Sequence, residues 1–217
     1  MTPGNALASP AAWQRLEAEA RALGIALDAS HRERLARLLA LLLEWNKKIN
    51  LTSVDRPDEV LDKHFLDSLA AAAAIPPTSG SVLDVGSGAG FPGLVIALVL
   101  PKVLVTTVEP IHKKVAFTRQ AARELQLANL TARAERLEQL EARQERFDVA
   151  VSRATFEPSE WLERAVPMVA AGGLVLAMTT AALPPLAPPP ELGFDHAVSY
   201  RVEGVAREVR CFLRKGA

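Results

Sequence analysis

The chain has 217 residues, of which 49% are hydrophobic and 23% are charged, and its 25 basic residues balance its 25 acidic ones. This length suits one domain with an extension, and the apolar content excludes a largely disordered chain. The formal net charge of zero argues against a protein that binds nucleic acid through a strong overall positive field, although local positive charge still permits such binding.

Three helices are predicted in the first third of the chain. The first covers residues 10–24, because its apolar positions fall on one side. The second runs to about Asn46. The third begins at Pro57, is favoured by the acidic residues that follow, and continues through the alanines up to Ala74. A Pro-Pro pair then breaks the chain, so residues 1–77 are interpreted as an N-terminal helical extension.

From residue 78 onward, apolar strands alternate with helices. Continuous apolar strands of this kind are typical of a parallel sheet with helices on both faces. The proline-rich segment 181–190 is interpreted as a stiff linker, and the two strands after it as a hairpin. Residues 78–217 are therefore predicted to form an α/β, Rossmann-like domain with a mostly parallel seven-stranded sheet and a C-terminal antiparallel hairpin. The predicted strands are 82–84, 103–109, 130–133, 147–152, 174–178, 194–202 and 205–213, and the predicted helices are 94–100, 113–126 and 161–169.

The most informative segment is VLDVGSGAGFPG at residues 82–93. Asp84 ends an apolar strand, and Gly86, Gly88 and Gly90 follow at alternate positions before an apolar helix. Such glycines let a ligand lie directly against the backbone, and the helix N-terminus adds free N–H groups. A dinucleotide uses G-x-G-x-x-G, a spacing that also occurs here, whereas S-adenosylmethionine is expected to use a G-x-G-x-G turn preceded by an acid. The long extension before the motif favours S-adenosylmethionine.

Polar residues also follow the other predicted parallel strands, and open α/β sheets bind ligands at these strand ends. Glu109 ends the second strand, where its carboxylate can accept hydrogen bonds from two ribose hydroxyls of either cofactor. Ala134 and Glu135 follow the third strand, where an adenine edge can meet them, although Glu135 also suits the start of the next helix. Ser152 and Arg153 end the fourth strand, so Arg153 either faces the departing methyl group or is a surface arginine.

Two polar groups in the extension have both a functional and a structural interpretation. Asn46, Lys47 and Asn50 follow the second helix; lysines can neutralise phosphate and asparagines can bond base edges, but both also suit a helix C-terminus. His64 and Asp67 are three residues apart on one helical face and can meet each other. That pair either orients a base or fixes the helix to the domain. The scattered histidines and single cysteine form no predicted metal site.

Six segments, in order over about residues 35–180, carry a resemblance to one known family. They are WNKKINLTS at 45–53, HFLDSL at 64–69, LDVGSGAGFPG at 83–93, KKVAF at 113–117, RAERLE at 133–138 and FDVAVSRA at 147–154. With these segments the chain resembles the RsmG (GidB) family, bacterial methyltransferases that act on guanine N7 in 16S ribosomal RNA. Many methyltransferases share the glycine motif, whereas the first two segments are much more specific.

The resemblance implies S-adenosylmethionine as cofactor and 16S ribosomal RNA, or the small ribosomal subunit, as partner. It implies that the polar residues of the extension lie near the RNA or the methyl group. Guanine N7 carries a lone pair and no proton, so we assign no catalytic base and give Arg153 an orienting role. The residues expected at the cofactor are Asp84, Gly86, Gly88, Phe91, Glu109, Ala134, Glu135 and Arg153, and those expected at the RNA are Asn46, Lys47, Asn50, His64 and Asp67.

The chain departs from the family pattern in places. Glu109-Pro110-Ile111 stands where Asp-Ser-Leu is common, which keeps the carboxylate, and Ala116 stands where a second basic residue is common. Glu157 and Glu160 follow Arg153 closely. A methyltransferase for a small molecule or protein, which the neutral charge suits, is the main alternative, and a non-catalytic RNA-binding factor or a nicotinamide enzyme is a further one.

The single cysteine and the absence of a recognisable signal segment or a membrane-spanning apolar run predict a cytoplasmic protein without a membrane partner. We further expect it to be a monomer without a metal ion.

Overall fold

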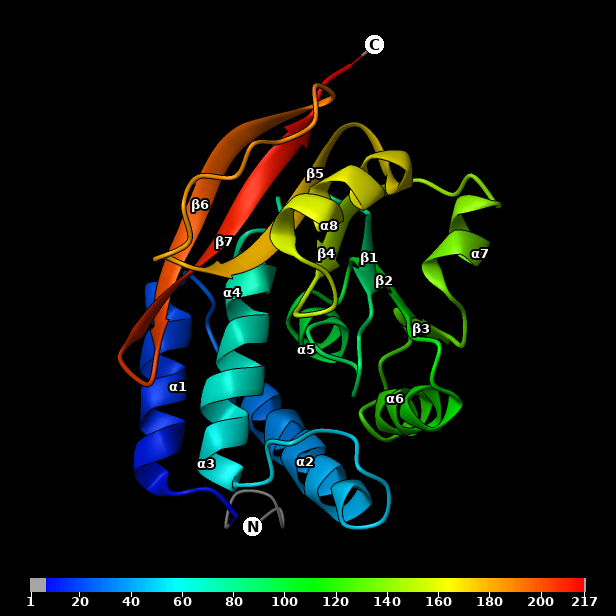
Figure 1. The fold of residues 1–217 in the computed structure, drawn as a ribbon. Coiled ribbons are helices and arrows are strands. Elements are labelled where there is room, and N and C mark those ends of the chain that lie inside the picture. Colours follow the sequence, from blue (N-terminus) through cyan, green and yellow to red (C-terminus); the bar gives the residue numbers. More distant parts are fainter. Residues whose placement is uncertain (1–6, 217) are drawn as a thin grey trace.

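The computed structural model describes residues 7–216, in which seven strands form one sheet (Figure 1). The strands are β1 (Ser81–Val85), β2 (Leu104–Val108), β3 (Leu130–Arg133), β4 (Phe147–Ser152), β5 (Val169–Thr180), β6 (Leu192–Val202) and β7 (Val205–Arg214). Their spatial order is β3-β2-β1-β4-β5-β7-β6. β1 to β5 pair in parallel, and β7 runs antiparallel to both β5 and β6. The predicted fold class is therefore confirmed.

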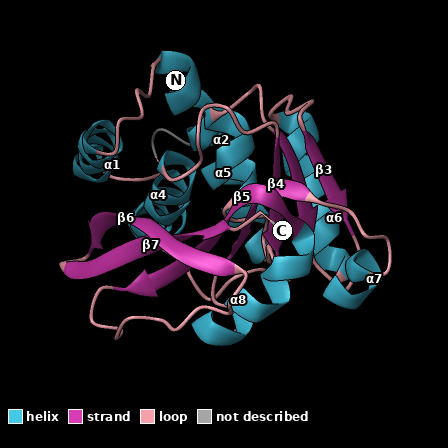
Figure 2. Cartoon of the chain, turned by 90° about the horizontal axis from the view of Figure 1, so that it is seen from above, coloured by secondary structure: helices cyan, strands magenta, loops and turns pink. Residues whose placement is uncertain are grey.

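Helices cover both faces of this sheet. They are α1 (Pro10–Ala22), α2 (Ala29–Asn46), α3 (Pro57–Val60), the π-helical segment η2 (Leu61–Leu66), α4 (Asp67–Ala73), α5 (Gly93–Val99), α6 (His112–Glu124), α7 (Leu137–Glu141), α8 (Pro158–Ala165) and the 3-10 turn η3 (Val166–Met168). Figure 2 shows α1, α2, α4 and α5 on one side of the sheet and α8 on the other. None of the described helices is long and apolar enough to cross a membrane.

The helices of the extension begin where capping chemistry places them. The Ser9 hydroxyl accepts a hydrogen bond from the Ala12 N–H (3.1 Å) and donates to the Asp58 carboxylate (2.8 Å), so it both caps α1 and ties α1 to α3. The Asp28 carboxylate accepts from the His31 N–H (2.8 Å) at the start of α2. These bonds satisfy N–H groups that have no partner within their own helices.

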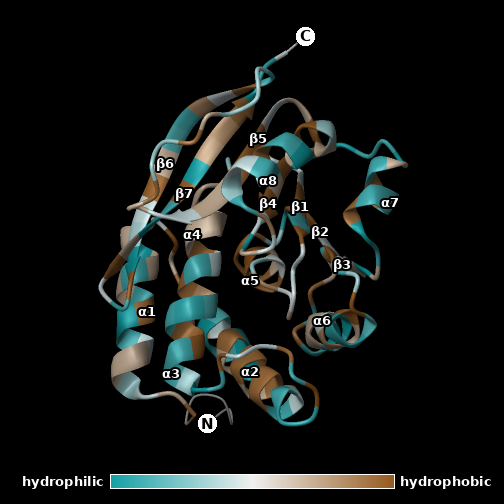
Figure 3. Ribbon diagram, in the orientation of Figure 1, coloured by the Kyte–Doolittle hydropathy of each residue, from teal (hydrophilic) through white to brown (hydrophobic). Residues whose placement is uncertain are grey.

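One hydrophobic core continues from the extension into the sheet domain. Leu38 of α2 and Phe65 of η2 are fully buried in the same cluster as Val95 of α5 and Phe117 of α6. A second cluster, which contains Trp161 of α8, packs on the opposite face of the sheet. Figure 3 shows the apolar residues as brown bands along α2 and the central strands. The predicted boundary at residue 77 thus falls between two parts that share a core.

Two local features differ from the sequence-based expectation. The third predicted helix, 57–74, is continuous but widens into the π-helical segment at Leu61–Leu66, a rare geometry that is frequent at functional sites. The helix predicted over 161–169 begins earlier, at Pro158, and ends at Ala165. β5 then begins at Val169, which pairs with Phe147 ahead of a shift in register.

Candidate functional site

A cavity of about 370 Å³ opens where the strand order reverses, at the carboxyl ends of β1, β2 and β4. This is the position where open α/β sheets bind their ligands. Its lining comes from the glycine turn after β1, from the ends of β2 and β4, and from the helical extension. The lining residues are Leu51, Thr52, His64, Gly86, Ser87, Gly88, Ala89, Phe91, Glu109, Pro110, Lys114, Arg153, Ala154 and Thr155.

The glycines of the turn serve different purposes. Gly86, Gly88 and Gly90 all have positive φ angles, of 68°, 57° and 81°, which side chains rarely adopt. A Cβ at Gly86 would overlap the Thr155 side chain, and one at Gly90 would overlap Leu94. A Cβ at Gly88 would meet no atom within 4 Å. Gly88 therefore leaves open space on the cavity side, whereas the other two glycines permit close packing of the protein itself.

Asp84 links the end of β1 to the start of α5 on the buried side of this turn. Its carboxylate accepts a hydrogen bond from the Gly93 N–H (2.8 Å) at the start of α5, while its second oxygen is buried without a partner among the described residues. Asp84 is outside the lining of the cavity, although we expected it at the cofactor. Burial, together with the negative charge of Glu109 nearby, raises the pKa of the Asp84 carboxyl to about 7.

This raised pKa predicts a measurable pH dependence of stability. Because the folded protein holds the Asp84 proton more tightly than the unfolded chain, the resulting stabilisation is complete below about pH 4 and is lost as the pH rises through 7. Relative to the Asp84→Asn variant, the wild-type free energy of unfolding should fall by about 2–4 kcal/mol between pH 4 and pH 8. Urea unfolding of both proteins across this range measures the difference, and parallel curves would contradict the expectation.

Two acidic side chains mark the ends of β2 and β3. The Glu109 carboxylate accepts hydrogen bonds from the N–H groups of Gly88 and Ile111, each at 3.0 Å, so both of its oxygens are held at the cavity wall. Glu135, which follows the half-buried Ala134, lines an adjoining cavity of about 310 Å³. One Glu135 oxygen pairs with Arg143 (2.9 Å), and the other is buried without a partner among the described residues.

An aromatic and cationic stack forms the cavity wall beside the extension. The Phe91 ring, only 1% exposed, lies parallel to the His64 ring with a centroid distance of 5.0 Å. The Arg153 guanidinium lies 6.0 Å from the Phe91 ring centroid. The sheet domain and the extension therefore meet at this wall, with His64 supplied by η2 and Arg153 by the end of β4.

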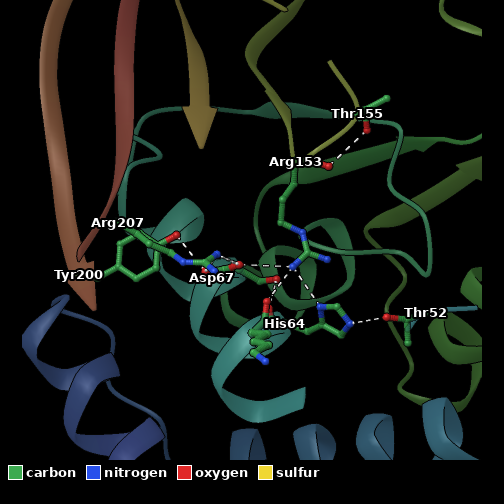
Figure 4. Close-up of polar contacts among 9 residues, drawn as sticks. Thr52, His64, Asp67, Arg153, Thr155, Tyr200 and Arg207 are labelled. Carbon is green, nitrogen blue, oxygen red and sulfur yellow. Dashed lines mark hydrogen bonds and ion pairs between the residues drawn. The ribbon is translucent and has the colours of Figure 1, made fainter. Parts of the chain in front are cut away.

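Arg153 contacts both His64 and Asp67, the two extension residues that the sequence places on one helical face (Figure 4). Its Nη1 donates to the Lys63 carbonyl (2.8 Å) and to His64 Nδ1 (3.0 Å), and lies 3.5 Å from the Asp67 carboxylate. His64 and Asp67 thus meet through Arg153, and the structure shows no direct bond between them. Arg153 fixes the extension to the end of β4.

Asp67 has two further partners, which the sequence did not reveal. Its carboxylate accepts hydrogen bonds from the Tyr200 hydroxyl of β6 (3.0 Å) and from Arg207 of β7 (2.9 Å). The Asp67 side chain is only 4% exposed, so its charge is balanced almost entirely by these groups and Arg153. The C-terminal hairpin is tied to the site in this way.

In the polar cluster after α2, Asn46 bonds the backbone of the following loop, whereas Lys47 and Asn50 are exposed. The Asn46 side chain accepts from the N–H groups of Leu51 (2.8 Å) and Thr52 (3.0 Å) and donates to the Thr52 carbonyl (3.0 Å). It therefore closes the loop that carries Thr52 into the cavity. Lys47 is exposed beside a separate hollow near Pro57, and Asn50 is exposed as well.

The structure thus brings part of the predicted set around one cavity. The predicted residues in its lining are His64, Gly86, Gly88, Phe91, Glu109 and Arg153, and those outside its lining are Asn46, Lys47, Asn50, Asp67, Asp84, Ala134 and Glu135. Sequence reasoning missed Thr52, although the residue lies inside the WNKKINLTS segment. Its position two residues after Asn50, a predicted RNA contact, was the available signal.

Comparison with known proteins identifies relatives along most of the chain. The family model for GidB, rRNA small subunit methyltransferase G, matches residues 31–183. The ribosomal RNA small subunit methyltransferase G of Methylobacillus flagellatus is 46% identical over 165 residues, which cover 76% of this chain and 79% of that protein. The protein of the same name from Myxococcus xanthus is 42% identical over 213 residues, which cover 93% of this chain and 96% of that protein.

Solved structures share the fold at lower sequence identity. The O-methyltransferase TomG of Streptomyces achromogenes, in complex with SAM, is 14% identical with a TM-score of 0.60, and the match covers 96% of this chain and 100% of that one. TrmN of Thermus thermophilus is 23% identical with a TM-score of 0.55, and covers 71% of this chain and 53% of that one. These similarities show a methyltransferase fold.

Proposed function

The chain belongs to the GidB family of rRNA small subunit methyltransferases G, and on this premise we propose that it transfers a methyl group from S-adenosylmethionine to N7 of a guanine in 16S ribosomal RNA. One observation carries the proposal. Thr52 and His64, from the two family-specific segments, line the same cavity as the glycine turn. A cofactor on that turn therefore faces the residues that distinguish this family from other methyltransferases.

The residues at the ends of β1, β2 and β3 fit the cofactor. The open space at Gly88 admits a ligand against the backbone, and the Glu109 carboxylate at the cavity wall suits ribose hydroxyls. The unpartnered oxygen of Glu135 in the adjoining cavity suits a donor such as the adenine amino group. When bound, S-adenosylmethionine supplies a methyl group that its sulfonium already activates.

The residues of the protein then contribute to the reaction by orienting guanine N7 toward the methyl group. Guanine N7 has an in-plane lone pair and no proton, so the residues around the cavity have no proton to remove before methylation. Correct alignment of two reactants can lower a barrier by up to roughly 7–11 kcal/mol. Arg153, His64 and Phe91 form a fixed wall for this purpose. The target guanine must be unpaired or turned out of its stack to present its edge there.

Replacing Gly88 with alanine should weaken cofactor binding far more than it weakens the fold. The added Cβ clashes with no protein atom, so the folded state bears only the cost of the left-handed backbone, about 1–2 kcal/mol. The same Cβ takes space from the cofactor, so we expect at least a tenfold rise in the Kd for S-adenosylmethionine by calorimetry. Gly24→Ala is the matched control, because Gly24 has φ 80° and open surroundings just after α1, outside the lining of the cavity. An equal Kd in both variants would contradict the cofactor's position.

Mapping of N7-methylguanine in small-subunit ribosomal RNA tests the proposed function directly. The RNA is taken from a host that lacks its own family member, with and without this protein. We expect one guanine to become methylated only when the protein is present. Labelled-methyl transfer to 16S RNA, compared with a panel of small molecules and proteins, is the second measurement. Transfer to the panel but not to the RNA would overturn the proposal.

A further inference from the structure

The Thr52 hydroxyl occupies a distinctive position in the cavity. Thr52 is half-buried, and its loop is fixed by Asn46. Its Oγ1 lies 2.9 Å from His64 Nε2 and accepts a hydrogen bond from the Val54 N–H (3.1 Å) (Figure 4). The role of this hydroxyl depends on which way its bond to His64 runs.

Arg153 determines that direction. A guanidinium can only donate hydrogen bonds, so His64 Nδ1, 3.0 Å from Arg153 Nη1, must be an acceptor without a proton. The neutral imidazole then carries its hydrogen on Nε2 and donates it to Thr52. Burial, and next the positive charge of Arg153, lower the pKa of His64 to about 3, which keeps the ring neutral at physiological pH.

The Thr52 oxygen is consequently saturated as an acceptor. A hydroxyl has two acceptor lone pairs and one donor hydrogen. The two lone pairs receive the hydrogens of His64 Nε2 and Val54 N–H, and no residue in the described range 7–216 accepts the remaining hydroxyl hydrogen. Toward a ligand in the cavity, Thr52 can therefore act as a donor and not as an acceptor.

We propose that the Thr52 hydroxyl donates a hydrogen bond to O6 of the target base and thereby selects guanine over adenine. The inference rests on the proposed function. Guanine presents two adjacent acceptors, N7 and O6, on the edge that is methylated, whereas adenine presents N7 beside an amino donor. An adenine amino group at Thr52 would find no free lone pair. Thr52 is thus a specificity-determining residue. Arg153 and His64 make its hydroxyl a hydrogen-bond donor toward the cavity.

A cycle of enzyme and substrate changes tests this assignment. The enzymes are wild type, Thr52→Val and the control Thr52→Ser, which keeps the hydroxyl. The substrates are two 16S RNA fragments with either guanine or 2-aminopurine, which has N7 but no O6, at the mapped position. Thr52→Val should lower kcat/KM on guanine about tenfold, the size of one hydrogen bond, but should cause no loss on 2-aminopurine. Thr52→Ser should behave as wild type.

The cycle cancels the different intrinsic reactivity of the two bases, because each is compared with itself across the enzymes. An equal loss on both RNAs would overturn the contact with O6. The affinity for S-adenosylhomocysteine, measured by calorimetry, should be unchanged in Thr52→Val, and a weakened affinity would assign the hydroxyl to the cofactor instead. Failure of the wild type to methylate the guanine RNA would refute the proposed function, and the inference with it.

Discussion

Replacing Arg153 with alanine is expected to lower kcat/KM for methyl transfer at least about a hundredfold, the effect of losing precise alignment at a reacting centre. The guanidinium holds His64 through Nδ1, faces the Phe91 ring and bonds the Lys63 carbonyl. Without it, the His64 ring loses the partner that fixes its tautomer. The wall of the cavity then has no fixed arrangement against which the target base can be aligned.

The fold should survive this substitution. Asp67 keeps its bonds to Arg207 and Tyr200, so its charge does not lose all its partners. Thermal unfolding of Arg153→Ala should therefore remain cooperative, and labelled-methyl transfer measures the activity separately. Arg146→Ala is the matched control, because Arg146 is exposed and, among residues 7–216, its side chain bonds only the neighbouring Glu145 carbonyl. Near-normal turnover in Arg153→Ala would remove Arg153 from its orienting role.

The sequence predicted the parts of the site that depend on local chemistry. The alternate glycines require positive φ angles, and the apolar strand before them fixes where the turn lies, so the position of Gly86 and Gly88 follows from the residues alone. The same reasoning placed Glu109 and Arg153 at strand ends, because parallel strands bring their carboxyl ends to one edge. The cavity includes all four of these residues.

Contacts between distant segments could not be predicted in this way. Asp67 meets Tyr200 and Arg207 only because the C-terminal hairpin continues the sheet over α4, and no local pattern encodes that pairing. The π-helical segment has an ordinary helical sequence, so its wider turn was not visible either. Asn46 stays a predicted RNA contact, but the bonds of its amide to the backbone of its own loop, two accepted by Oδ1 and one donated by Nδ2, were not visible in the sequence.

Because of these distant contacts, loss of the Asp67 carboxylate should destabilise the fold strongly. In Asp67→Asn, Arg153 and Arg207 lose the carboxylate that they share, while the volume of the side chain is kept. Breaking a buried ion pair costs about 3–5 kcal/mol, and we expect about 3 kcal/mol here because both arginines keep partial access to water. Urea unfolding measures this change. Methyl transfer should fall as well, since Arg153 loses an anchor.

Two further variants show how much of this destabilisation comes from the buried Asp67 charge. One removes a neutral hydrogen bond to Asp67, and the other removes an exposed ion pair elsewhere. Tyr200→Phe removes one hydrogen bond to Asp67 but leaves both ion pairs, so it should cost only about 1 kcal/mol. Glu160→Gln removes an exposed ion pair with Arg164 on α8, and its effect should stay within about 0.5 kcal/mol. If Asp67→Asn were no less stable than Glu160→Gln, the buried carboxylate could not be what holds the hairpin and the extension together. The two arginines would then be satisfied by water, and the coupling between hairpin and cavity would have to run through apolar packing alone.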